Sequence, residues 1–259
     1  MTARVLTTLC LSLALFGANA QSTQPKPAAG DPAKPAVRET PPDQKAYNEA
    51  SKITDNEKKI AALEKLKTDF PGSMYASIAD SQIFSTLIQK MPEQKDRIRK
   101  AAKAMFAVSV AWDKIASKRE MFPTMASRGS TATRIADQLA TGDLLLQDAE
   151  SYARRGVKAL RENVWMAEQR EASAKQKMKI PSREELHKDF AETRASRIGT
   201  LGRVELKLGH TALARKLLEE SYAVTPSDAK VAAALGELAA KSGDDATKKK
   251  AEKTLSKIK

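Results

Sequence analysis

The fold is decided by a pattern that occurs twice near the end of the chain. Leu201–Leu217 reads LGRVELKLGHTALARKL, and Leu235–Ala251, thirty-four residues later, reads LGELAAKSGDDATKKKA. Both copies begin with a Leu-Gly pair, and each has a second Gly followed three residues later by an Ala. A repeat of this length is typical of helical hairpins that stack side by side. The sequence therefore predicts an all-α repeat array, with two clear repeats over 195–259.

The residue types in each copy suit the positions that a helical hairpin gives them. Gly202 and Gly236 are expected where the two helices of a hairpin cross, because a missing Cβ lets the backbones approach closely. Gly209 and Gly243 are expected to end the first helix, because glycine readily adopts left-handed backbone angles. Pro226 should end the second helix of the first copy, since proline interrupts a helix, and Ser227 or Asp228 can cap the next helix.

These features together resemble tetratricopeptide repeats. The first copy contains the Leu-Gly pair, the turn Gly, the small and apolar residues of the second helix and the closing Pro, as Leu201, Gly202, Gly209, Ala214, Leu218 and Pro226. The resemblance implies an α-solenoid whose first helices, the A helices, line a groove for extended peptides. Two hairpins alone bury too little apolar surface, so about three or more are expected. We therefore expect divergent repeats in 43–194.

Two segments of 43–194 fit divergent repeats of the kind found in exported bacterial proteins. The first, 43–90, has helical patterns that we expect to be capped by Asp43, by Asp55 or Asn56, and by Ser73 after a break at 70–72. The second, Met125–Arg161, turns at 142–143. Between them, Pro92 is expected to open a long helix that ends before Phe122-Pro123.

A charged segment separates the divergent repeats from the clear ones. Val164 to Lys179 has a helical composition but does not fit the thirty-four-residue register, so we interpret it as an inserted helix. Ser182 and Glu185 then form a capping box, in which each side chain reaches the backbone N–H of the other residue. The helix that this box opens leads into the first clear repeat.

The N-terminus reads as an export signal. Residues 1–20 contain a basic residue, an apolar run of about a dozen residues and a small-residue cleavage site at Ala18 and Ala20. The run is too short for a membrane span, which needs about twenty residues, so we expect no transmembrane span in the mature chain. The only cysteine, Cys10, lies in this run. A cysteine-free exported helical chain is expected to be periplasmic or secreted.

The next segment, 21–42, is expected to be a disordered linker. It contains six prolines among Ala, Lys and Ser, a composition that cannot form a packed core. We interpret it as a tether that precedes the folded repeats.

No motif in the sequence indicates catalysis, a cofactor or a metal. Glu184 and His187 have the Glu-x-x-His spacing of di-iron bundles, but the second such motif that those sites need is absent. His210 is the only other histidine. Ser227 and Lys230 have the Ser-x-x-Lys spacing of serine acylases, yet Ser227 follows a proline and starts a helix, where it is better read as a cap. We therefore expect a protein that is not an enzyme.

The resemblance also indicates which residues should face the peptide groove. In the family, groove residues follow the Leu-Gly pair of each A helix or lie near the helix start; the matching positions here are Ser196, Arg203, Lys207, Lys230, Glu237 and Lys241. The Lys and Asn that the family uses to clamp a C-terminal carboxylate are absent, since Gly199 and Arg203 occupy those positions in the first repeat. Arg203 and Lys207 favour an acidic protein or peptide as the partner.

Three functions remain open from the sequence. The first is a non-enzymatic scaffold for protein–protein interaction. The second is the helical N-terminal module of a thioredoxin-like redox protein that lacks its catalytic domain, because similar helical regions precede such domains while no Cys-x-x-Cys occurs here. The third is a charge-driven binder of anionic envelope polymers, since the net charge is +13. Export and the lack of a nucleic-acid-binding motif argue against nucleic acid as the partner.

Overall fold

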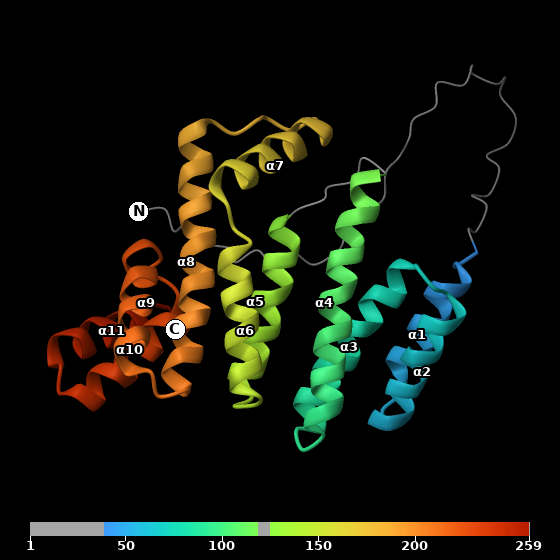
Figure 1. Ribbon diagram of the computed structural model, residues 1–259, viewed down its shortest axis with the longest axis horizontal. Coiled ribbons are helices and arrows are strands. Elements are labelled where there is room, and N and C mark those ends of the chain that lie inside the picture. The colour runs from blue at the N-terminus through green and yellow to red at the C-terminus, as the bar shows by residue number, and fades with distance from the viewer. Residues whose placement is uncertain (1–38, 119–124, 259) are drawn as a thin grey trace, which may run out of the picture. The chain divides into compact units, whose positions relative to one another are not determined.

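The computed structural model describes residues 39–118 and 125–258, which form eleven helices and no strand (Figure 1). The fold is therefore all-α, as expected. The expected signal peptide with its cleavage site at Ala18 and Ala20, nearly all of the linker and the break at Phe122-Pro123 lie outside the described residues. The helices are α1 (Pro42–Lys52), α2 (Asn56–Asp69), α3 (Met74–Lys90), α4 (Lys95–Lys118), α5 (Met125–Thr141), α6 (Leu146–Lys158), α7 (Glu162–Lys175), α8 (Arg183–Lys207), α9 (Thr211–Val224), α10 (Ala229–Ser242) and α11 (Asp245–Ile258).

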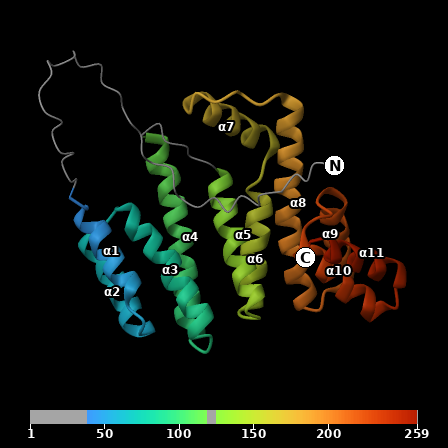
Figure 2. The same ribbon diagram turned by 180° about the vertical axis from the view of Figure 1, so that it is seen from behind.

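Helices that follow one another in the chain pack against one another. This holds from α1 to α6 and again from α8 to α11, and the hairpins α5–α6, α8–α9 and α10–α11 make the most extensive contacts (Figures 1 and 2). Helix α8 also packs on α5, α6 and α10, so that it joins the earlier hairpins to the last one. The described helices thus form an array of adjacent pairs. None of them is long and apolar enough to cross a membrane.

The two copies of the sequence repeat become the hairpins α8–α9 and α10–α11. Gly209 and Gly243 have φ angles of +83° and +70°, so both adopt the left-handed conformation expected at the end of the first helix. At Gly202 an added Cβ would lie 2.9 Å from Leu218 Cγ on α9, which shows how closely α8 and α9 cross. The same position in the last hairpin is looser, because a Cβ on Gly236 would lie 3.5 Å from Ala251 Cβ.

Most of the expected helix starts are confirmed by side-chain caps. Asp55, Ser73 and Asp228 accept hydrogen bonds from backbone N–H groups in the first turns of α2, α3 and α10. The capping box of Ser182 and Glu185 is complete at the start of α8. These caps satisfy amide groups that have no partner within their helices.

Two expected starts are wrong. Helix α1 begins at Pro42, so Asp43 lies in its first turn and does not cap it. Proline suits this first helical position, because its fixed φ is already helical and its missing N–H is not needed there. Helix α4 begins at Lys95 and not at Pro92, which lies in the turn before the helix.

Apolar side chains join the hairpins into three clusters. The largest draws on helices α1 to α6 and includes Leu201 and Val204 of α8. A second is built from α9 and α10, with Leu255 of α11 packed against it. Helix α7 is attached separately, because Trp165 packs edge-on against Phe190 of α8 with ring centroids 5.8 Å apart. The segment interpreted as an insertion is thus a helix that packs on α8.

Candidate binding groove

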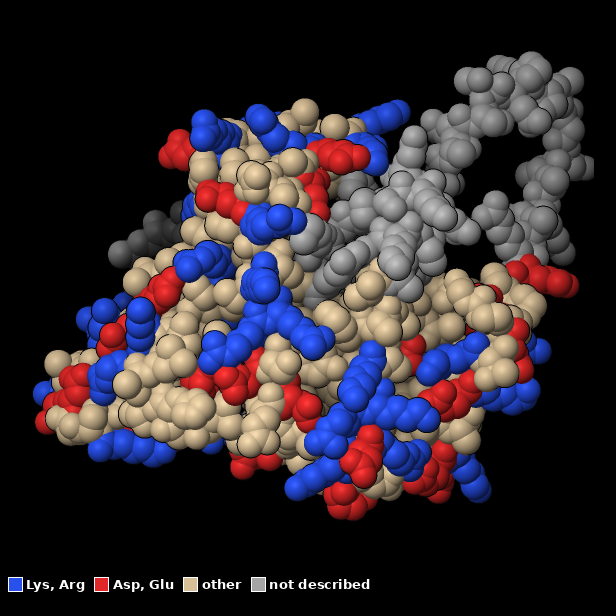
Figure 3. All heavy atoms as spheres, in the orientation of Figure 1, with Lys and Arg blue, Asp and Glu red and all other residues tan. Residues whose placement is uncertain are grey.

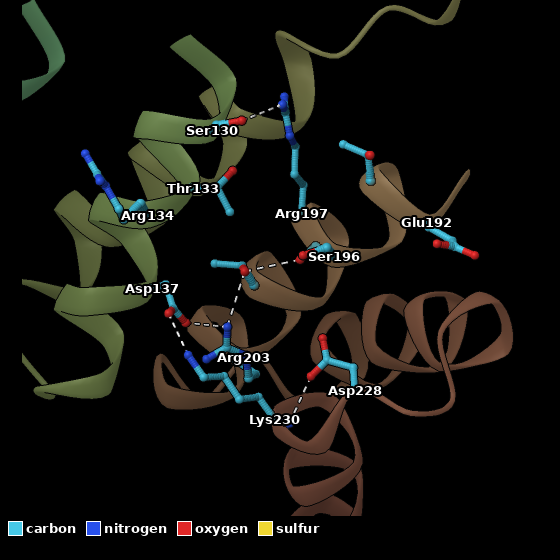
Figure 4. A pocket seen from close by; sticks show the side chains of 12 residues that line it. Ser130, Thr133, Arg134, Asp137, Glu192, Ser196, Arg197, Arg203, Asp228 and Lys230 are labelled. Atoms are coloured by element: carbon cyan, nitrogen blue, oxygen red, sulfur yellow. Dashed lines mark hydrogen bonds and ion pairs between the residues drawn. The ribbon is translucent and has the colours of Figure 1, made fainter. Parts of the chain in front are cut away.

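The most prominent cavity among the described residues lies between α5, α8 and the start of α10 (Figure 4). Its volume is about 570 Å³. These three helices are the first members of the hairpins α5–α6, α8–α9 and α10–α11, which is where the resemblance to tetratricopeptide repeats predicted a groove. The residues that line it are mostly charged or hydroxylated: Ser130, Thr133, Arg134, Asp137, Glu192, Thr193, Ser196, Arg197, Thr200, Arg203, Asp228 and Lys230. We call this cavity the groove.

Glycines allow α5, α6 and α8 to approach one another at one end of the groove. A Cβ on Gly129 of α5 would lie 2.0 Å from Arg197 Nη1, so the absent side chain leaves space for the guanidinium. A Cβ on Gly156 of α6 would lie 2.3 Å from Thr133 Oγ1. A larger residue at Gly129 would displace the guanidinium of Arg197, and one at Gly156 would collide with Thr133.

Arg197 is a buried cation in the wall of the groove. Only 3% of its surface is exposed, and its Nη1 donates a 2.8 Å hydrogen bond to the backbone oxygen of Gly156. Nη2 lies 3.3 Å from Ser130 Oγ. Burial lowers the pKa of Arg197 to about 10, partly offset by the negative charge of Glu168. The side chain is therefore still charged at neutral pH.

Asp137 bridges two of the basic residues across the groove. Its Oδ1 lies 2.5 Å from Arg203 Nη2 and its Oδ2 lies 2.7 Å from Lys230 Nζ, which joins α5 to both α8 and α10 (Figure 4). Burial alone would raise the pKa of Asp137, but the charges and hydrogen bonds of Arg203 and Lys230 outweigh it and hold the pKa below its usual value. A single carboxylate thus holds both cations in place.

The groove retains donors that its own residues do not use. Nε of Arg203 is buried and has no hydrogen-bond acceptor in the described part of the chain. Arg134 donates to Ser81 Oγ at 3.2 Å and forms no ion pair with a described carboxylate. The carboxylate of Asp228, by contrast, is engaged by the backbone amides of Lys230 and Val231 at 2.9 and 3.1 Å. Arg134 is therefore a groove cation without a carboxylate partner among the described residues, and Glu192 is an exposed groove carboxylate.

The structure brings together three of the six residues that the sequence assigned to a groove. Ser196, Arg203 and Lys230 all line the cavity. Lys207 lies outside it and forms a 3.2 Å ion pair with Asp143. The other two also lie outside the cavity and pair with each other along α10 at 2.7 Å; they are Glu237 and Lys241.

The sequence interpretation missed the contribution of α5. Asp137 and Arg134 belong to a divergent repeat without the Leu-Gly pair, so no family position could be assigned to them. Arg197 was missed because an Arg in a charged helical segment is ordinarily solvated. The glycines at 129 and 156 were the signal that could have shown space for a buried side chain between α5 and α6.

Both histidines pair with glutamates of their own surroundings. His187 Nδ1 lies 2.5 Å from Glu162 Oε1 on α7, and the structure shows no contact between His187 and Glu184. His210 Nδ1 lies 2.7 Å from Oε2 of Glu205, a fully buried carboxylate. Within 39–118 and 125–258, no three His, Cys, Asp or Glu residues lie close enough to hold a metal ion.

Ser227 does not cap α10, because the side chain of Asp228 accepts the hydrogen bonds at that helix start. Ser227 therefore lies in the turn between α9 and α10 rather than in the role that the sequence suggested for it.

Comparison with known proteins adds no relative to this description. No protein-family model matches the sequence, and no curated protein is significantly similar to it. The arguments for function therefore rest on the groove and on the surface of the described helices.

Proposed function

We propose that this chain is a non-enzymatic scaffold that binds an extended, acidic segment of a partner protein in the groove. The observation that carries the proposal is the convergence of three first helices, α5, α8 and α10, on one cavity lined by charged and hydroxyl side chains, of which four are basic and three acidic. The repeat pattern at 195–259 supports a place in the tetratricopeptide family, and the N-terminal pattern supports export to the periplasm or the cell exterior.

The polar lining of the groove favours a polypeptide over a small apolar ligand. Small-molecule sites are mostly lined by apolar and aromatic side chains, whereas no described aromatic residue lines this cavity. Lys230 is well exposed, with 59% of its side chain accessible, so a ligand can reach its ammonium group directly. Hydroxyls such as Ser196 can donate to or accept from a peptide backbone.

The charges favour an acidic segment. The groove has four basic residues and three acidic ones, and two of those acids, Asp137 and Asp228, are already engaged within the protein. A carboxylate from a partner would find the ammonium group of Lys230 accessible. Hydrogen bonds between charged groups are shorter and stronger than neutral ones, so they would also fix the register of the bound segment.

Site-specific photocrosslinking tests the proposal and identifies the partner in the same experiment. A photoreactive amino acid replaces Ser196, which is exposed in the groove, or Lys216, which is exposed on α9 and does not line the groove. Each variant of the chain is expressed in its native host, irradiated, and analysed by mass spectrometry. We expect one prominent crosslinked polypeptide from position 196 that is absent from position 216.

The crosslinked residues of the partner provide the second readout. The proposal predicts that they lie in a segment rich in Asp and Glu. Equal crosslinking from both positions, or none from position 196, would contradict groove binding.

A further inference from the structure

The α7–α8 loop presents two large apolar side chains to solvent. Met178 is 55% exposed and Ile180 is 49% exposed, and both lie in the short connection between Lys175 and Arg183. Exposed apolar side chains that cluster on a surface usually mark a contact site. None of these loop residues lines the groove.

The loop is held firmly at both ends. Lys177 adopts a left-handed conformation, with φ of +53°, and the amide of Met178 donates to the Ser173 oxygen at 2.9 Å. The amide of Lys177 donates to the Ala174 oxygen at 3.1 Å, which completes a Schellman motif at the end of α7. In such motifs the apolar residue at the position of Met178 commonly packs back onto the helix, but here it points largely into solvent.

The capping box of Ser182 and Glu185 fixes the other end of the loop, directly after Pro181. Ile180 precedes that proline, and residues before proline favour extended backbone. The loop therefore presents Met178 and Ile180 from a short, ordered tip.

Basic residues alternate with these apolar ones. The tip reads Lys177-Met178-Lys179-Ile180 and contains no acidic residue. Lys177 has no ion pair with any described residue, and Lys179 lies near Glu185, whose carboxylate is engaged in the capping box. Figure 3 shows Lys and Arg side chains together with Asp and Glu side chains and uncharged atoms along the edge where α7 lies.

We propose that the α7–α8 loop docks the protein on the surface of an anionic lipid bilayer. Met178 and Ile180 would enter the boundary between headgroups and acyl chains, while Lys177 and Lys179 reach the lipid phosphates. Lysine suits this position because its aliphatic stem lies along apolar surface while its ammonium stays in the headgroup layer.

The shape of the loop favours a bilayer over a protein partner. A specific protein interface buries about 800 Å² on each side, whereas this tip offers only two apolar side chains. A bilayer needs no complementary shape, and binding to it increases with the apolar area that is inserted and with the attraction of cations to anionic lipid. The inference does not depend on groove binding.

Vesicle sedimentation tests the proposal. The purified chain from Gln21 to Lys259 contains every described residue and omits the apolar run expected to be a signal peptide. It is mixed with vesicles of phosphatidylglycerol and phosphatidylcholine, or of phosphatidylcholine alone. We expect binding only to the anionic vesicles, with a decrease at high salt.

Three variants separate specific docking from general attraction. Each lysine near an anionic surface contributes about fivefold to binding, so K177Q/K179Q should bind about 25-fold more weakly. The apolar variant M178S/I180S should lose at least about fivefold while the net charge is unchanged. The control K248Q/K249Q removes the same charge from α11, which lies away from the loop in both ribbon views, and should retain nearly all binding.

Each other outcome would overturn the proposal. An equal loss in the loop and α11 lysine variants would mean that only net charge attracts the protein to lipid. Unchanged binding of M178S/I180S would exclude insertion of the loop. If wild type fails to bind vesicles and a photocrosslinker at position 178 instead captures a protein, the loop is a protein contact.

Discussion

Replacing two equivalent glycines by alanine should change stability in opposite directions. Gly202 and Gly236 occupy the same position in the two sequence repeats and lie inside α8 and α10. Within a helix, alanine is more favourable than glycine by about 1 kcal/mol, because glycine loses more backbone freedom on folding. Any difference between the two substitutions must therefore come from the surroundings of the new Cβ.

Those surroundings differ in the structure. At Gly202 the added Cβ would lie 2.9 Å from Leu218 Cγ and 3.2 Å from Leu217 Cβ, both on α9. Neither atom is the end of a flexible side chain, so α9 would have to shift, and overpacking of this kind costs about 1–3 kcal/mol. At Gly236 the closest atom, Ala251 Cβ, would be at an ordinary contact distance of 3.5 Å.

The expected free energies of unfolding follow from these two effects. G236A should be stabilised by about 0.5–1 kcal/mol, since it gains helix propensity without a clash. G202A should be destabilised by up to about 2 kcal/mol, because the clash exceeds the same gain. Urea unfolding followed by circular dichroism at 222 nm measures both. If G202A were stabilised as much as G236A, the result would contradict the close approach of α8 and α9 at Gly202.

Two further predictions concern buried charge. D137N should lower the free energy of unfolding at pH 7 by about 2 kcal/mol, because Arg203 and Lys230 lose their shared carboxylate. Since the folded pKa of Asp137 is depressed, its contribution is present above the unfolded pKa and is lost as pH falls through the folded pKa. The difference in free energy of unfolding between wild type and D137N should therefore be smaller at about pH 3 than at pH 7, and a difference independent of pH would contradict this. R154A should cost about 2 kcal/mol in the same assay, because Glu205 is fully buried and loses a 2.6 Å hydrogen bond from Arg154 while its other oxygen keeps its contact with His210. The control E150Q removes the other ion pair of Arg154 and should lower the free energy of unfolding by less than about 1 kcal/mol. If R154A and E150Q were destabilised equally, the hydrogen bond from Arg154 to Glu205 would not be the stabilising contact.

The repeated hairpins could be predicted because their turn and cap residues are determined by the backbone conformation within a few residues. Gly209 and Gly243 need left-handed backbone angles, and Ser182 with Glu185 needs only neighbouring amides, so both features are readable within a few residues. The starts of α1 and α4 were misplaced for a related reason. A proline can occupy the first helical turn or a turn before the helix, and the local sequence does not distinguish these cases.

The groove could be predicted only in part, because its key contacts join distant segments. Asp137 lies 66 residues before Arg203 and 93 residues before Lys230, so their ion pairs depend on how α5 packs against α8 and α10. Family positions identified the two cations but not their carboxylate. The attachment of α7 through Trp165 is likewise a tertiary contact without a local pattern.

The affinity of the crosslinked partner for groove variants tests the central claim most directly. Isothermal titration would compare the wild-type chain Gln21–Lys259 with K230Q, which removes an accessible groove cation, and with K248Q, which removes the same charge from α11. Circular dichroism confirms that each variant is folded. Loss of a charged hydrogen bond to the partner should weaken binding of K230Q at least about 30-fold, while K248Q binds as wild type. Equal affinities for all three proteins would contradict a partner site in the groove.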